Sequence, residues 1–186
     1  KDMAADVFAE LELDDQQYII ASMSDTEASH IIDNLMADDA TDLLEEMPAN
    51  VVKKILAKAS PETRADINHL LRYPEYSAGS IMTVEFIDLR EMMTVEDAIL
   101  KIKRRGLDSE TVNICYVVDN QRILKGTVAL RYLLLREPGE LIGDIMNTKV
   151  ISINTQQDQE EAALTIQKYG FTAMPVVDNE NQIGRA

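Results

Sequence analysis

The sequence predicts an α+β protein in which an all-α first part, residues 1–72, precedes a duplicated β-α-β-β-α unit. Two observations support this fold class. In the first part, apolar residues recur at helical spacing in short units that repeat about every twelve residues. After residue 72 the apolar pattern changes to strands alternating with helices, and several short motifs occur twice in the same order.

Sequence signals mark the starts of helices in the first part. Ser24 and Glu27 have the spacing of a capping box, and Ser60 precedes Pro61 at a first helical position. Helices of about ten residues are too short to be stable in isolation. We therefore expect neighbouring helices to stack and bury a continuous core, as in a helical solenoid.

The second part has the element order β-α-β-β-α. Residues 86–89 read as a strand, and Thr94 caps a helix that ends near Arg105. Two strands, residues 113–119 and 123–130, follow, and a helix begins at Arg131.

The same pattern then begins again, which indicates an internal duplication. The segment 78–82 matches 142–146, and 94–98 aligns with 158–162. The motif Val-Val-Asp-Asn at 117–120 returns at 176–179.

Composition limits the possible partners. The formal net charge is −15, and residues 1–72 hold 16 Asp/Glu against 6 Lys/Arg, a net of −10. The remainder has a net charge of −5. Such acidity disfavours nucleic acid and anionic membrane surfaces as partners. The single cysteine, Cys115, lies in an apolar run and is expected to be a buried hydrophobe in a reducing cytosol. No apolar run is long enough to cross a bilayer, so we expect a soluble segment with no direct membrane insertion.

Two motif sets carry a family resemblance. The duplicated unit, with Gly-x-Ile-Met before each copy, resembles a pair of cystathionine-β-synthase (CBS) domains, and residues 171–178 look like the strand after the first helix of such a module. The acidic helical part followed by the junction 72–83 resembles MgtE-type magnesium transporters. This likeness implies an acidic helical N-domain at 1–72, a first CBS module with its linker at 73–141, and a second CBS module at 142–186. The second module stops before its last strand and helix are complete.

The resemblance implies a cytosolic magnesium-sensing region at the cytoplasmic face of the cell membrane. In that family Mg²⁺ bridges the N-domain and the CBS pair and closes the pore at high Mg²⁺. The implied partners are a second copy of the chain, bound through the CBS domains, and the protein's own membrane domain. The metal positions carried over by the resemblance are Asp6, Asp38, Asp42, Asp158 and Glu160.

The carboxylates also have simpler interpretations. Asp38 and Asp42 are four residues apart and so share one helical face, where a cation would relieve their repulsion. However, Asp38 and Asp158 could each cap a helix. Asp42 and Glu160 could be solvated acids in a first helical turn, where the helix dipole favours them.

Two other functions remain open. CBS pairs also sense adenosyl nucleotides, but Ala129 and Tyr132 stand where a hydroxyl and a carboxylate would hold a ribose. An acidic scaffold for protein partners is the third possibility. No enzyme is expected, since no nucleophile, phosphate loop or zinc-spaced cluster was found.

Overall fold

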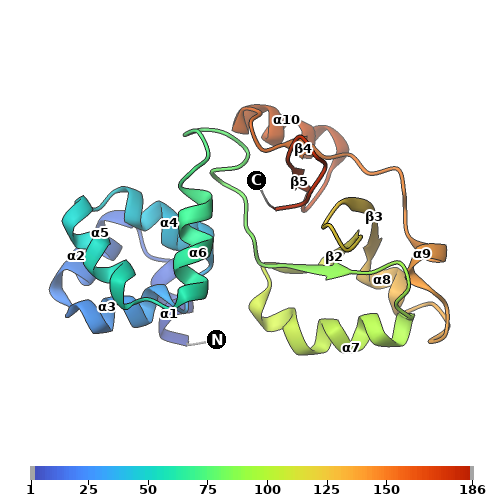
Figure 1. Ribbon diagram of the computed structural model, residues 1–186, viewed down its shortest axis with the longest axis horizontal. Helices are drawn as coiled ribbons and strands as arrows, with labels where there is room; N and C mark the ends of the chain where they lie inside the picture. Colours follow the sequence, from blue (N-terminus) through green and yellow to red (C-terminus); the bar gives the residue numbers. More distant parts are fainter. Residues whose placement is uncertain (1–2, 185–186) are drawn as a thin grey trace. The chain divides into compact units, whose positions relative to one another are not determined.

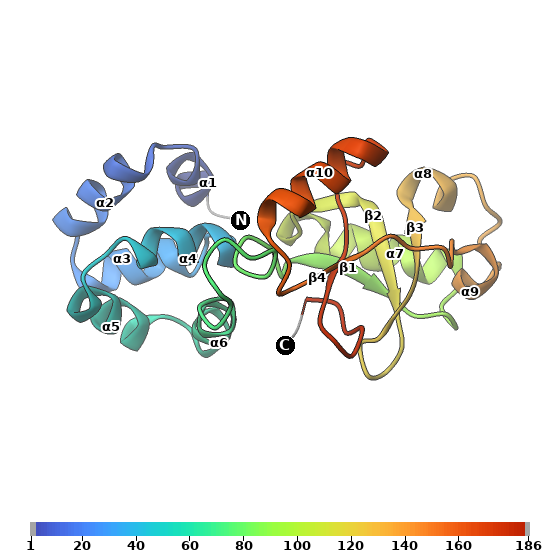
Figure 2. The same cartoon turned by 90° about the horizontal axis from the view of Figure 1, so that it is seen from above.

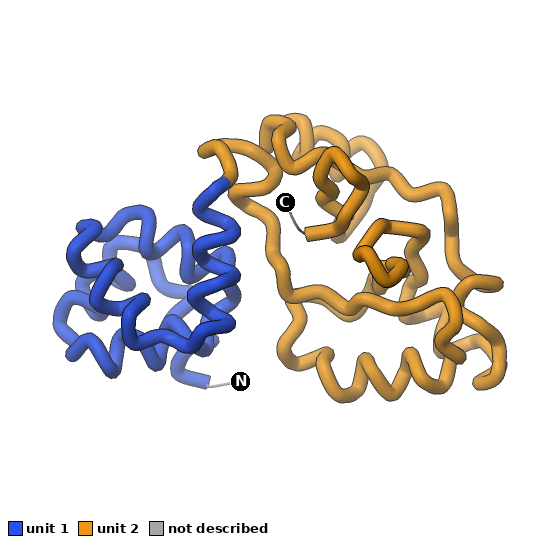
Figure 3. Tube along the Cα trace, in the orientation of Figure 1, with its two compact units in different colours: residues 1–72 blue, residues 73–186 orange. Residues whose placement is uncertain are grey.

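The computed structural model describes residues 3–184. The chain divides between Arg72 and Tyr73 into two compact units, which Figure 3 colours separately. Unit 1 is residues 1–72 and unit 2 is residues 73–186. Across residues 3–184, no helix combines the length and the apolar character needed to span a membrane.

Unit 1 is built from short helices, as the repeat predicts (Figure 2). Each helix packs mainly against the helix two places along the chain: α1 on α3, α2 on α4, α3 on α5 and α4 on α6. This stacking buries one apolar core, which includes Phe8, Ile32, Leu43 and Ile67. The solenoid architecture is therefore confirmed. The helices are α1 (Met3–Ala9), α2 (Leu13–Ser22), α3 (Asp25–Ile32), α4 (Ala37–Glu45), α5 (Ala49–Lys58) and α6 (Pro61–Leu70).

The predicted caps of unit 1 form as expected. Ser24 accepts the N–H of Glu27, and Glu27 in turn accepts the N–H of Ser24 at 2.9 Å. Ser60 accepts the N–H of Thr63 at the start of α6. These bonds satisfy amides that the first helical turn leaves without a helical partner.

Unit 2 contains the two predicted copies. The first, module 1, is residues 73–141, and its sheet has the order β1-β2-β3, of which β2 and β3 are labelled in Figure 1. Strand β1 is parallel to β2, and β2 is antiparallel to β3. One core joins this sheet to α7 and α8. Its elements are β1 (Phe86–Leu89), α7 (Val95–Arg105), the 3-10 turn η1 (Gly106–Asp108), β2 (Thr111–Val118), β3 (Leu124–Ala129) and α8 (Leu130–Leu133).

Cys115 lies in the middle of β2 and is fully buried, which confirms its interpretation as a small hydrophobe. Burial raises the pKa of its thiol to about 12, and the nearby charge of Lys101 opposes this only in part. The thiol therefore stays protonated and unreactive at neutral pH.

Module 2, residues 142–186, repeats the β-α-β part of this order with shorter strands, and its described residues contain no counterpart of β3 or α8. It contains α9 (Ile142–Ile145), β4 (Ile153–Asn154), α10 (Gln159–Tyr169) and β5 (Val176–Val177), and β4 is parallel to β5. The strand expected over 171–178 is thus reduced to two residues. Pro175 has no N–H group and so cannot donate a hydrogen bond to a neighbouring strand. On the side away from β4, β5 makes only one bridge among the described residues, between Val177 and Ile183. The helix expected from Arg131 is likewise only one turn.

The segment that leads into module 1 is held by module 2. The N–H of Ala78 donates to the carbonyl of Gln157 at 2.7 Å, and that of Gly79 donates to the carbonyl of Thr155 at 2.9 Å. Gly79 approaches Tyr73 so closely that a Cβ atom would lie 2.5 Å from its ring and 2.9 Å from the Thr155 carbonyl.

The segment that leads into module 2 is held by module 1 in the same way. Ile142 and Gly143 donate their N–H groups to the carbonyls of Met93 and Glu91, both at 2.9 Å. Each of these residues lies 64 positions from its counterpart in the bonds described above. The two modules therefore exchange their leading segments.

The repeated Val-Val-Asp-Asn motif forms the same turn in both modules. The Oδ1 atom of Asp119 accepts the N–H groups of Gln121 and Ile123, at 2.9 and 3.0 Å. Asp178 makes the equivalent bonds to the N–H groups of Glu180 and Gln182, at 2.9 and 2.8 Å.

The two turns also bind each other reciprocally. Leu124 donates its N–H to the carbonyl of Asn181, and Ile183 donates its N–H to the carbonyl of Arg122. Arg122 and Asn181 both have positive φ, 65° and 61°. This left-handed conformation is uncommon outside glycine. Its occurrence at both equivalent positions confirms the duplication in detail.

We predict that Gly79→Ala weakens unit 2. The added methyl group would force Tyr73 or the Thr155 carbonyl to move, at a cost of about 1–3 kcal/mol in the free energy of unfolding. Thermal unfolding should show the melting temperature lowered by several degrees. Gly139→Ala is the matched control, because its Cβ would meet no atom within 4 Å. Equal melting temperatures for the two variants would contradict the close approach.

Candidate metal-binding residues and a cavity in unit 2

Asp158 and Glu160 lie at the start of α10. Asp158 is the N-cap residue, and its Oδ1 atom accepts the N–H of Glu160 at 2.7 Å. Glu160 lies in the first turn, and both side chains are exposed. The capping role predicted for Asp158 and the first-turn position of Glu160 are therefore confirmed. Neither role occupies all four carboxylate oxygens, so both residues still offer hard oxygen donors to a cation.

The start of α10 is also where the junction segment is attached. The N–H of Gln159 donates to the carbonyl of Tyr76 at 2.9 Å, and Ser77 forms an antiparallel bridge with Asp158. Tyr76 has a φ of 64°, which turns the chain sharply before this bridge. The candidate ligands on α10 thus share backbone contacts with the segment that connects to unit 1.

Asp38 and Asp42 both lie on α4, one helical turn apart, as expected. Asp38 is not the cap: Met36 occupies the N-cap position and makes no side-chain capping bond. The capping interpretation of Asp38 is therefore wrong, because the helix begins two residues earlier than a cap at Asp38 would require. The side chain of Asp38 is partly buried, and its Oδ1 atom is inaccessible to solvent.

Asp42 is the sixth residue of α4 and so does not lie in its first turn. The interpretation of Asp42 as a first-turn acid is wrong for that reason. Asp42 is exposed, but nearby packed residues partly desolvate its carboxyl, and this desolvation raises the pKa of the carboxyl above its ordinary value.

Asp6 lies exposed on α1. Within residues 3–184, no group of three or more His, Cys, Asp or Glu side chains is arranged to hold a metal ion. The five candidate residues therefore form no ready-made cluster. Magnesium does not require one, because it retains several waters and is commonly held by one or two carboxylates. The donor chemistry of these residues fits that ion.

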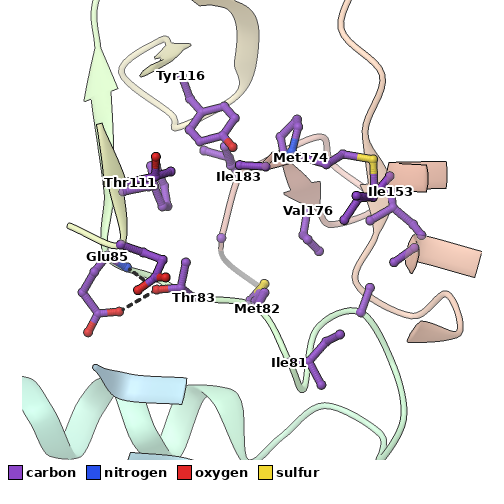
Figure 4. A pocket seen from close by; sticks show the side chains of 18 of the residues that line it. Ile81, Met82, Thr83, Glu85, Thr111, Tyr116, Ile153, Met174, Val176 and Ile183 are labelled. Atoms are coloured by element: carbon purple, nitrogen blue, oxygen red, sulfur yellow. Dashed lines mark hydrogen bonds between the residues drawn. The ribbon is translucent and has the colours of Figure 1, made fainter. Parts of the chain in front are cut away.

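Unit 2 contains a cavity of about 270 Å³ that sequence analysis did not predict. Its walls come from three parts of unit 2: the start of module 1 up to β1, the strand β2 with the residue before it, and module 2 from β4 through α10 to β5 and beyond (Figure 4). No local motif marks such a cavity, because the fold assembles it from residues nearly a hundred positions apart. Its lining is largely apolar and includes Met82, Phe86, Tyr116, Met174 and Ile183.

Two lining residues form an aromatic pair. The rings of Phe86 and Tyr116 are 5.5 Å apart in an edge-to-face arrangement. Burial raises the pKa of Tyr116 to about 12, with a smaller contribution from Cys115. The Tyr116 hydroxyl therefore stays protonated at neutral pH.

Comparison with known proteins gives the family. The model of the MgtE intracellular N domain matches residues 1–76, and the CBS domain model matches residues 142–184. The soluble part of a magnesium transporter superposes with a TM-score of 0.93 at 35% identity, over 97% of this chain and 71% of the other. The chain belongs to the MgtE family. The cytosolic domain of the Mg²⁺ channel MgtE in complex with ATP gives a TM-score of 0.90 at 36% identity, over 98% and 75% of the two chains.

Two curated relatives, both named as the magnesium transporter MgtE, agree with this family assignment. The protein of Thermus thermophilus is 40% identical over 78% of this MgtE-family chain, and that of Bacillus subtilis is 34% identical over 97% of it. The chain spans 33% and 40% of their respective lengths. Both relatives are named as magnesium transporters.

We predict that the capping role of Asp158 depends on the oxygen acceptor and not on charge. Asp158→Asn should change the free energy of unfolding by no more than about 0.5 kcal/mol, whereas Asp158→Ala should lower it by about 1 kcal/mol. Urea denaturation of unit 2 measures both. Thr94→Ala, at the equivalent cap of α7, is the positive control, since Thr94 accepts the N–H of Asp97 at 3.1 Å. If Asp158→Ala cost nothing, the cap would be unimportant.

Proposed function

We propose that this chain is the magnesium-sensing cytosolic region of a magnesium channel or transporter, at the cytoplasmic face of the cell membrane. Membership of the MgtE family carries this proposal. The acidic character of both units supports it, because net charges of −10 and −5 repel each other until cations bind.

In this mechanism the carboxylates of Asp6, Asp38 and Asp42 in unit 1 and of Asp158 and Glu160 in unit 2 hold Mg²⁺. The bound ion supplies positive charge and an octahedral set of oxygen sites. At high Mg²⁺ the carboxylates of both units share the ions, and the units are held together. At low Mg²⁺ the carboxylates repel one another and the units separate.

The connection to α10 gives this movement a route. Tyr76 and Ser77 are bonded to the residues that start α10, so a displacement of unit 1 pulls on the segment beside Asp158 and Glu160. In the complete protein the movement would reach the membrane domain and open the pore. A ligand shifts such an equilibrium only through different affinities for the two states, and ions shared between the units satisfy that condition.

We predict that Asp38→Asn and Asp42→Asn each weaken magnesium-induced compaction of the chain. Each substitution removes an anionic ligand and keeps the side-chain size, so stability in chelator should change by no more than about 0.5 kcal/mol. Small-angle scattering with chelator and with millimolar Mg²⁺ measures the radius of gyration.

Asp15→Asn is the matched control, because it removes the same charge from an exposed site on α2. A sodium series at matched ionic strength separates specific binding from screening. If the parent radius were unchanged by Mg²⁺, the sensing mechanism would fail for this chain. If the parent compacted with Mg²⁺ and both aspartate variants compacted to the same extent, only the assignment of Asp38 and Asp42 as ligands would fail.

We also propose that the chain forms a homodimer through its CBS modules. Large apolar side chains are exposed on unit 2. In module 1 these are Leu107, Leu134 and Leu135, which are 81%, 64% and 79% exposed, and in module 2 Leu164 on α10 is 64% exposed. A contiguous exposed apolar patch is typical of an interface, and Leu134 and Leu135 are adjacent in the chain.

We predict dimers in sedimentation at high protein concentration. Leu134→Glu with Leu135→Glu should shift the equilibrium towards monomers, because a carboxylate cannot be buried unpaired in an apolar interface. Gln121→Glu with Gln156→Glu, which adds the same two carboxylates at exposed polar positions of unit 2, should not. Monomers alone at every concentration would overturn the dimer.

A second candidate function is the sensing of an adenosyl ligand. The cavity of unit 2 supports it, since it is the kind of concave apolar site that small ligands occupy. The ATP complex of a related cytosolic domain also supports it. Against it, Ala129 ends β3 and Tyr132 lies 56% exposed on α8, so neither offers a ribose an ionised acceptor.

A further inference from the structure

The connection between unit 1 and unit 2 is short, and its first residues are still bonded to unit 1 (Figure 3). Helix α6 ends at Leu70. Beyond it, Leu71 donates its N–H to the carbonyl of Ile67 at 3.0 Å, and Arg72 donates its N–H to the carbonyl of His69 at 3.3 Å. The backbone of unit 1 is therefore held as far as Arg72, its last residue.

The next residue, Tyr73, is already fixed in unit 2. Only 7% of Tyr73 is exposed, and its ring occupies the space that a side chain at Gly79 would need. Pro74 restricts it further, because a residue that precedes proline is biased towards extended backbone. The chain therefore passes from one held residue to the next, with no slack residue between them.

Residues 73–79 form a compact loop that is closed on itself. Tyr73 and Gly79 meet at its two ends. Within the loop, Ser77 donates its N–H to the carbonyl of Pro74 at 3.1 Å, and the Ser77 carbonyl accepts the hydroxyl of Ser80 at 2.9 Å. A loop whose ends touch and whose interior is bonded in this way behaves as a packed surface element and not as a flexible tether.

The other side of this loop is attached to module 2 around the start of α10. Three backbone hydrogen bonds make the attachment: Ala78 to Gln157, Gly79 to Thr155, and Gln159 to Tyr76, in each case from the N–H to the carbonyl. Ser77 is 4% exposed at the same place. A displacement at Tyr73 therefore acts on these three bonds, unless the loop opens first and absorbs it.

We propose that unit 1 pivots at the junction of Arg72 and Tyr73, and that Tyr73 is the positioning residue that passes the movement to the start of α10. The proposal rests on the magnesium-sensing function above and adds the place of the pivot. Because the backbone is held on both sides, the torsion angles of the junction absorb the rotation, as in hinges made of a few residues at the end of an element. The contact of the Tyr73 ring with Gly79 keeps the loop closed, so the loop cannot take up the movement instead.

Amide hydrogen exchange in chelator and in millimolar Mg²⁺ tests this role. In the parent, the amides of Ala78, Gly79 and Gln159 should exchange at least about threefold more slowly in Mg²⁺, because unit 1 then no longer pulls on their bonds. Tyr73→Ala should remove most of this magnesium response, while small-angle scattering still shows compaction. Tyr73→Phe keeps the ring and should keep the response. A merely structural role of Tyr73 would change the exchange equally with and without Mg²⁺.

An insertion tests the pivot with every side chain of the loop retained. Gly-Gly-Ser placed between Arg72 and Tyr73 adds a flexible tether on the unit 1 side of the ring contact. The three amides should then lose their magnesium response, although the chain still compacts. The same insertion between Thr148 and Lys149, two exposed residues between α9 and β4, is the matched control and should keep the response.

The outcomes separate this proposal from the sensing mechanism. If the chain with the junction insertion kept the parent's response, or if the control insertion also abolished it, the role of Tyr73 would be overturned. A parent that compacts in Mg²⁺ without any change in the exchange of the three amides would overturn it as well and leave magnesium sensing standing. A parent that does not compact in Mg²⁺ would overturn the sensing mechanism and the pivot together.

Discussion

The exchange of leading segments between the two modules is the interaction on which unit 2 depends. Neither module holds its own leading segment: Ala78 and Gly79 bond to module 2, whereas Ile142 and Gly143 bond to module 1. Because backbone groups make these hydrogen bonds, the bonds can form even where the side chains of the two copies differ. Because each module completes the other, neither copy has all of its backbone partners when alone, and the pair is expected to fold as one unit.

This exchange also places the candidate metal residues of α10. The leading segment of module 1 follows the last helix of unit 1 along the chain. It bonds to module 2 at the start of α10, beside the Asp158 cap. A helix start favours anions through its dipole and its free amides. Two carboxylates at the same helix start, Asp158 and Glu160, nevertheless repel each other electrostatically. A cation is the simplest group that would relieve this repulsion without removing either role.

Much of this arrangement could be predicted from the sequence, because it depends on local signals. Ser24 with Glu27, and Thr94, mark helix starts through bonds within three residues, and both are present. The duplication is predictable because Asp119 and Asp178 each fold their own turn. The cap assigned to Asp38 failed because the two consecutive acids Asp38 and Asp39 leave the helix start ambiguous, and the buried Ala37 is already part of the helix. The cavity could not be predicted, since tertiary packing alone brings Phe86 beside Ile183.

The stacking of unit 1 has a consequence for the order in which its parts open. A helix that packs on a neighbour on each side is held more firmly than a helix that packs on one neighbour. Helix α4 packs on both α2 and α6, whereas α5 packs mainly on α3. The amide hydrogens of α5 should therefore exchange with solvent before those of α4. Asp38 and Asp42, two of the proposed ligands, lie on a helix that is held on both sides, so their spacing should persist while α5 opens.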